Sequence, residues 1–91
     1  MRILTSIDPA GATTLVVAGT LNGTCIADFK RALSAARRLR QPIRLDLSDV
    51  ALIDRPSLQY LVDLARSEVM LVNCPEYISR WMDREGVQPS R

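Results

Sequence analysis

The sequence predicts a single α/β domain in which strands and helices follow the order ββαβαβα, with a mixed sheet and helices packed on it. Two patterns lead to this prediction. Apolar and polar residues alternate over residues 43–47, which is typical of a strand. Residues 25–39 and 56–66 instead repeat apolar residues every three or four positions, which is typical of a helix that buries one face.

The whole chain of 91 residues has the size of one domain with one core. We expect residues 1–91 to form this single domain, with a core of about 2–87 and a short tail at 88–91. Residues 2–6 and 13–18 read as an opening pair of strands.

The helix expected at 25–39 follows a polar segment in which Asn22 or Thr24 can cap its first turn. After Pro42 a strand begins at Ile43, and apolar character continues through Ile53 to the helix at about 56–66. Residues 69–73 begin with four apolar residues in a row, which predicts a strand that is covered on both faces and is central or parallel in the sheet. The last helix follows Pro75 and ends at Gly86.

Composition argues against an enzyme or a cofactor protein. The chain has no histidine, so the usual general base for a serine or cysteine nucleophile is missing. Its four glycines form no phosphate-binding loop, and its two cysteines form no CxxC pair. We therefore expect no cofactor, no metal and two reduced cysteines. With no signal peptide and no long apolar run, we also expect a cytoplasmic protein that does not insert into a membrane.

Three aspartates, Asp46, Asp49 and Asp54, lie near the end of the strand at 43–53 and could hold a metal or accept a phosphoryl group. A structural explanation is favoured for each of them. Alternation exposes Asp46, Asp49 belongs to a turn, and Asp54 caps the helix that follows.

Five basic residues fall between Lys30 and Arg40. They could bind nucleic acid or anionic lipid, but the aromatic residues are not interleaved with them and the net charge is only +2. A solvated helix face is favoured, and an acidic protein partner fits the same residues. We expect no nucleic-acid partner.

Tyr60 and Leu64 lie outside the apolar stripe of the helix at 56–66. Being four residues apart, they would share one side of that helix. Two alternatives remain open: they form an exposed apolar patch for a partner, or they pad the flank of the core.

The segment Leu45-Asp46-Leu47-Ser48, followed by Val50, Ile53 and Asp54, carries a family resemblance. Together with Leu21-Asn22-Gly23 it resembles the STAS domain of bacterial anti-sigma factor antagonists, and the similarity extends from Leu15 to Val87. The resemblance implies a STAS-like fold and a role in protein–protein regulation.

In that family the aspartate is followed by two hydroxyl residues and a glycine, and a partner kinase phosphorylates the second hydroxyl. Here Arg55, Pro56 and Ser57 follow Asp54, so the phosphoacceptor position holds a proline. Ser57 lies one residue further on, which would rotate a helical side chain by about 100°. We therefore expect no phosphorylation control, and we expect Arg55 to be the last residue before the helix or its N-cap.

The resemblance implies a partner that is an anti-sigma factor or a related kinase. Alternatives are an accessory role on the ATPase subunit of an ABC-type lipid transporter, small-ligand sensing, and a homodimer. The predicted partner-binding residues are Asp54, Arg55, Pro56, Ser57, Tyr60 and Leu64.

Overall fold

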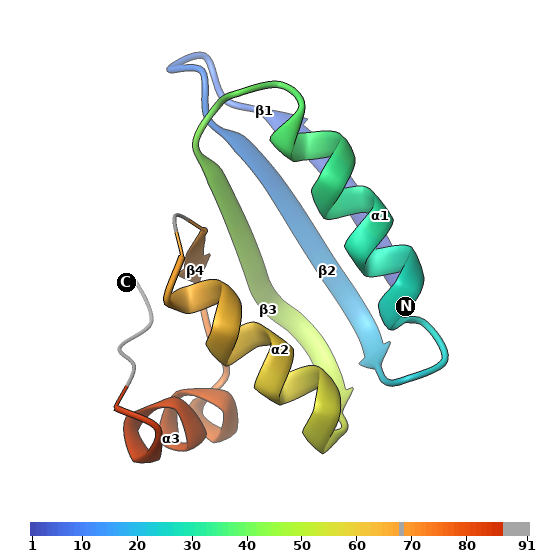
Figure 1. Ribbon diagram of the computed structural model, residues 1–91, viewed down its shortest axis with the longest axis vertical. Helices are drawn as coiled ribbons and strands as arrows, with labels where there is room; N and C mark the ends of the chain where they lie inside the picture. Colours follow the sequence, from blue (N-terminus) through green and yellow to red (C-terminus); the bar gives the residue numbers. More distant parts are fainter. Residues whose placement is uncertain (68, 87–91) are drawn as a thin grey trace.

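The computed structural model describes residues 1–67 and 69–86 and shows a mixed four-stranded sheet with three helices (Figure 1). The predicted tail at 88–91 lies outside the described residues. Along the chain the elements are β1 (Arg2–Ile7), β2 (Thr13–Leu21), α1 (Ile26–Arg37), β3 (Ile43–Ile53), α2 (Arg55–Ala65), β4 (Met70–Val72) and α3 (Glu76–Arg84). The predicted order ββαβαβα and the mixed sheet are confirmed.

The strands lie in the order β1-β2-β3-β4. The opening pair is antiparallel, with Arg2 opposite Ala18 and Ile7 opposite Thr13. β3 is parallel both to β2 and to β4. Because β2 and β3 are parallel and Leu21 pairs with Ile53, the segments that follow these two strands start side by side at one end of the sheet.

The helices cover one face of the sheet. Alternate strand residues such as Leu15, Val17, Leu45 and Leu47 are fully buried and join one core with the buried residues of α1, α2 and α3. Figure 1 shows α1 and α2 in front of the strands. The strand residues that alternate with these buried ones point to the opposite face of the sheet, which we call the open face. The open face carries Thr14, Val16, Arg44, Asp46, Met70 and Val72.

β4 differs from its prediction. It is parallel, as expected, but it is a three-residue strand at the edge of the sheet and is not central. Leu71 and the preceding Val69 are buried, whereas Met70 is 44% exposed. Alternate residues of this apolar run therefore face the core and the open face. The strand is covered on one face only.

The caps of α1 and α2 also refine the sequence interpretation. Asn22 and Thr24 bond to each other in the loop, and the N-cap of α1 is Cys25, which makes no side-chain capping bond. α2 begins at Arg55 with Asp54 as its N-cap, so the expectation that Arg55 precedes or caps the helix is wrong. None of the helices in the described part of the chain combines the length and apolarity that crossing a bilayer requires.

Leu64 is only 4% exposed and packs in the core. Leu64→Ala should therefore lower the free energy of unfolding by about 2–5 kcal/mol, because it removes buried methyl groups and leaves a cavity. Urea unfolding followed by circular dichroism measures this change. Leu39→Ala, at a side chain that is 47% exposed, is the control and should stay within about 0.5 kcal/mol of the unchanged protein. A loss below about 1 kcal/mol at Leu64 would contradict its placement in the core.

Candidate functional site

Asp54 joins the start of α2 to the loop between β2 and α1. One carboxylate oxygen accepts a hydrogen bond from the N–H of Ser57 at 3.0 Å, and the other accepts one from the N–H of Gly23 at 2.8 Å. The N–H of Asp54 itself donates to the carbonyl of Leu21 at 3.1 Å. One side chain thus caps a helix and ties down a loop that is 31 residues earlier in the chain.

These contacts favour the charged form of Asp54. The Ser57 hydroxyl, the Ser57 N–H and, to a smaller extent, the Gly23 N–H lower the pKa of Asp54 below its ordinary value of 3.8, while desolvation opposes them. Among the described residues the Ser57 hydroxyl has no hydrogen-bond partner, whereas both N–H groups make hydrogen bonds. We therefore assign the lowered pKa mainly to the two N–H donors.

Arg55 and Pro56 occupy the first turn of α2, and both are exposed. The first turn suits a proline because its N–H groups have no partner within the helix. The Arg55 guanidinium lies 5.0 Å from the centre of the Trp81 ring, so a cation–π contact connects it to α3. The fixed positive charge at this site is therefore held against the neighbouring helix.

Ser57 points inward. Its side chain is 1% exposed, and its hydroxyl oxygen is buried. A kinase would have to unfold the first turn of α2 to reach this hydroxyl. The burial agrees with the interpretation that Ser57 does not replace the missing hydroxyl at Pro56.

The structure decides between the two alternatives for Tyr60 and Leu64. Leu64 belongs to the core, and Tyr60 packs edge-to-face on Phe29 of α1 with ring centres 5.8 Å apart. The ammonium group of Lys30 lies 4.9 Å from the centre of the Tyr60 ring. The expected exposed apolar patch is therefore wrong: the helical wheel placed these residues beside the stripe, but α1 and the sheet cover that side of α2 as well.

Of the six predicted partner-binding residues, the structure thus exposes Arg55 and Pro56 and leaves Asp54 partly exposed. Ser57 and Leu64 lie behind this surface, and Tyr60 lies between α1 and α2.

Sequence reasoning missed two neighbours of this site. Gly23 donates to Asp54, and Trp81 supports Arg55. The parallel pairing of β2 with β3 is the signal that could have linked the Gly23 loop to Asp54, because the carboxyl ends of parallel strands meet at one edge of a sheet. Nothing comparable in the sequence placed Trp81 beside Arg55.

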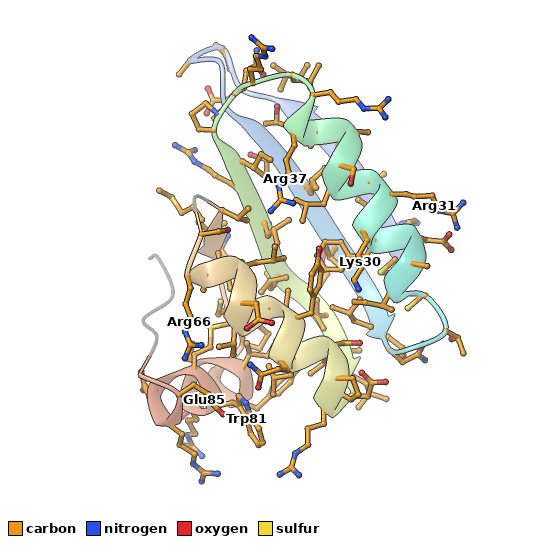
Figure 2. The ribbon with its side chains drawn as sticks, in the orientation of Figure 1. Lys30, Arg31, Arg37, Arg66, Trp81 and Glu85 are labelled. Carbon is orange, nitrogen blue, oxygen red and sulfur yellow. The ribbon has the colours of Figure 1, made fainter. Side chains whose placement is uncertain are left out.

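The basic residues of α1 do not form one continuous face. Figure 2 shows Lys30 and Arg37 on the side of α1 toward α2, and Arg31 on the opposite side. Arg31 pairs with Asp28 at 2.6 Å in an exposed ion pair, which contributes little to stability. The cations therefore lie on different sides of α1, so they do not form the single basic face that nucleic-acid binding would need.

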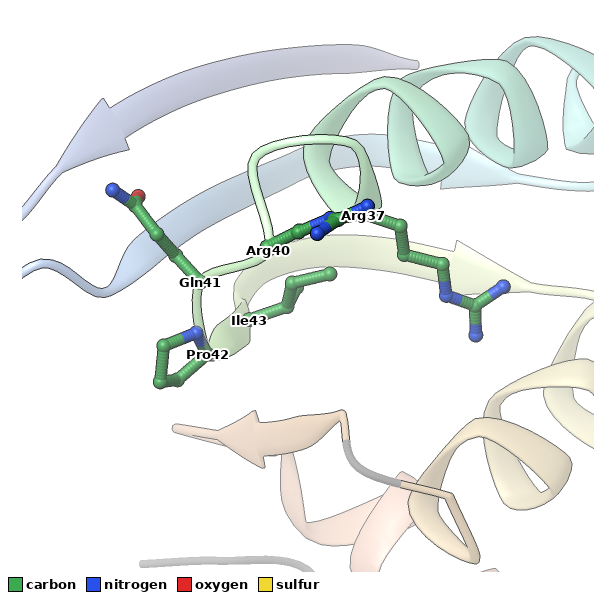
Figure 3. Close-up of a pocket in the computed structure, with 5 residues that line it drawn as sticks. All are labelled: Arg37, Arg40, Gln41, Pro42 and Ile43. Carbon is green, nitrogen blue, oxygen red and sulfur yellow. The ribbon is translucent and has the colours of Figure 1, made fainter.

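A hollow of about 490 Å³ lies where α1 ends and β3 begins (Figure 3). It is lined by Arg37, Arg40, Gln41, Pro42 and Ile43. Because Ile43 starts β3 and Asp54 follows its end, this hollow lies at the opposite end of the strand from the start of α2. It is not part of the same surface.

The acidic residues do not meet. Asp49 lies within β3 and pairs with Ala18, so the expectation that it belongs to a turn is wrong. Asp46 accepts hydrogen bonds from Ser48 and Asn73 on the open face, far along β3 from Asp54. Desolvation raises the pKa of Asp46, but the hydrogen bonds outweigh it and the net pKa is lowered. Over residues 1–67 and 69–86, no group of three Asp, Glu or Cys side chains could share a metal ion.

Both cysteines are free thiols. Burial, with a smaller contribution from the nearby charge of Asp46, raises the pKa of Cys74 to about 11. The thiolate is the nucleophilic form, so Cys74 is protonated and unreactive at neutral pH. Cys25 is engaged in the loop, where its sulfur accepts from the N–H of Asn22 at 3.2 Å.

The chain matches no family model, and no curated protein is detectably similar to it.

The charge of Asp54 should contribute to stability in a pH-dependent way. Because its pKa in the folded state lies below 3.8, the contribution is complete above about pH 4 and is lost as the pH falls through the folded pKa. The difference in unfolding free energy between the unchanged protein and Asp54→Ala should thus be largest near neutral pH and shrink in acid. Urea unfolding at a series of pH values measures it.

Asp83→Ala removes an exposed carboxylate of α3 and is the matched control for the loss of one negative charge. If the difference for Asp54→Ala is the same at pH 7 and pH 3, the carboxylate's charge does not support the helix start.

Proposed function

We propose that this chain is a non-enzymatic, STAS-like regulatory domain of the cytoplasm that binds another protein through the start of α2 and lacks phosphorylation control. The contact surface consists of Asp54, Arg55 and Pro56 together with Gly23 and Thr24 of the neighbouring loop. All of these residues are exposed or partly exposed.

The single observation that carries the proposal is the rigid, exposed junction built on Asp54. Its carboxylate fixes two segments at once, so Arg55 and Pro56 are presented on a backbone that is ordered before any partner arrives. A surface that is already ordered loses less conformational entropy on binding. The resemblance to STAS domains points to the same junction.

The absence of phosphorylation control is supported by two residues. Pro56 has no hydroxyl at the position where the family has its phosphoacceptor, and the hydroxyl of Ser57 is buried. Arg55 adds a fixed positive charge at the site where phosphorylation would add about −1.5 to −2. The surface therefore carries the charge of a permanently unphosphorylated domain.

The charge of Arg55 favours a partner whose contact region is acidic. By resemblance, this partner is an anti-sigma factor or a related kinase. The alternatives are the ATPase subunit of an ABC-type lipid transporter and a small ligand. Affinity capture from the native cytoplasm with identification by mass spectrometry distinguishes the two kinds of protein partner.

Arg55→Glu should weaken capture of that partner at least tenfold, because it reverses the charge at the centre of the surface. Arg84→Glu makes the same change at the exposed end of α3 and should leave capture unchanged. Melting temperatures of both variants show whether each domain is folded. Equal capture by the unchanged protein and by a folded Arg55→Glu variant would place the contact surface elsewhere.

Incubation with a kinase of the STAS-binding type and ATP should leave residues 54–57 without phosphate, since Pro56 has no acceptor and Ser57 is buried. Pro56→Ser restores a hydroxyl at an exposed position and should take up one phosphate. Intact mass and peptide spectra measure both results. A phosphoserine at Ser57 of the unchanged protein would show that the switch has moved by one residue and has not been lost.

A further inference from the structure

The open face of the sheet has no covering layer among the described residues. The buried apolar residues of the helices join the core on the other side of the strands. Two rows of side chains cross the open face: Thr14, Arg44 and Met70 form one row, and Val16, Asp46 and Val72 form the next.

The open face carries exposed apolar side chains among its polar ones. Leu4 pairs with Val16 and so lies on this face, where it is 56% exposed, and Met70 is 44% exposed. A hollow of about 460 Å³ lies over β2, β3 and β4, where the apolar Met70 and Val72 line it together with the polar Thr14, Arg44, Asp46 and Asn73. Apolar patches of this kind mark contact surfaces.

The charges of the open face are balanced and alternate. Arg2 and Asp49 both pair with Ala18, so the face carries two cations and two anions, with Arg44 and Asp46 two residues apart at its centre. Among the exposed residues of α1, by contrast, the three cations Lys30, Arg31 and Arg37 outnumber the one anion, Asp28. A surface with equal charges of both signs is complementary to a second copy of itself, whereas the surface of α1 would repel its own copy.

We propose that the open face is a homodimer interface, in which two copies of the chain pack sheet against sheet as a sandwich. A two-fold axis across the strands at the level of Leu45 would place each row of one copy over the other row of the second copy. Arg44 then faces Asp46 of the second copy, and Met70 faces Val72. This inference is independent of the proposed function, because it concerns the other face of the sheet.

The contacts that Arg44 and Asp46 make within one copy leave both side chains able to contact a second copy. Arg44 lies 3.5 Å from Asp8 in an ion pair in which both side chains are substantially exposed, so that pair contributes little. Asp46 is held in place by Asn73 and Ser48, which orients its carboxylate on the face. An ion pair between copies would add to these hydrogen bonds without requiring that they break.

The size of the face sets the strength of the dimer. Four strands of three to eleven residues, spaced about 4.8 Å apart and rising about 3.3 Å per residue, give a footprint of about 460 Å² per copy. Stable interfaces typically bury about 800 Å² per partner, so the smaller footprint of this face favours a weak, reversible dimer.

Sedimentation velocity of the full chain from about 5 μM to 1 mM should show a concentration-dependent shift from monomer to dimer. Met70→Glu places a charge in the apolar part of the face and should raise the dissociation constant at least tenfold. Leu39→Glu makes the same change at a residue that is 47% exposed beyond the end of α1, and it should leave the dissociation constant unchanged. Circular dichroism confirms that each variant is folded.

A charge exchange tests the register. Arg44→Glu alone and Asp46→Arg alone should each weaken the dimer, because each places like charges opposite one another. In an equimolar mixture of the two variants, Glu or Asp faces Arg in both pairs, so association should return as a heterodimer. If Asp46→Arg does not fold, the dissociation constant of the Met70→Glu variant still tests whether the open face forms the interface.

Three results would overturn the proposal. The protein could remain a monomer at 1 mM. It could form a dimer that a folded Met70→Glu variant leaves intact, which would assign the interface to another surface. Finally, folded charge variants could fail to associate when mixed, which would exclude the antiparallel arrangement of the two β3 strands.

Discussion

The exposed start of α2 depends on the two oxygens of the Asp54 carboxylate. One oxygen caps the helix and the other holds the N–H of Gly23, so a single side chain fixes the end of β3 relative to the loop that follows β2. The parallel pairing of the two strands makes this contact possible, because it brings their carboxyl ends to the same edge. The geometry of Arg55 and Pro56 follows from that anchor.

The fold could be predicted from the sequence wherever the pattern of apolar residues was local and regular. Alternation over Ile43–Leu47 identified β3, and three- and four-residue spacing identified α1 and α2. β4 was misplaced because an apolar run gives no information on how many faces are covered. Met70 and Val72 are apolar on the open face, so their hydrophobicity did not reveal that they are uncovered.

The candidate site was predictable only in part. Asp54 as a helix cap follows from residue type and position. The inward direction of Leu64 does not, because a helical wheel ranks the sides of one helix without showing how far its neighbours wrap around it. The contacts of Gly23 with Asp54 and of Arg55 with Trp81 join residues 31 and 26 positions apart, and no local pattern encodes such pairs.

Pro56 has a consequence for the unfolded chain as well as for the surface. Its ring fixes one backbone angle and restricts the residue before it, so the unfolded ensemble has fewer conformations around residues 55 and 56. Folding therefore removes less backbone entropy there than it would with serine. In the folded domain the same restriction holds the first turn of α2 close to one shape.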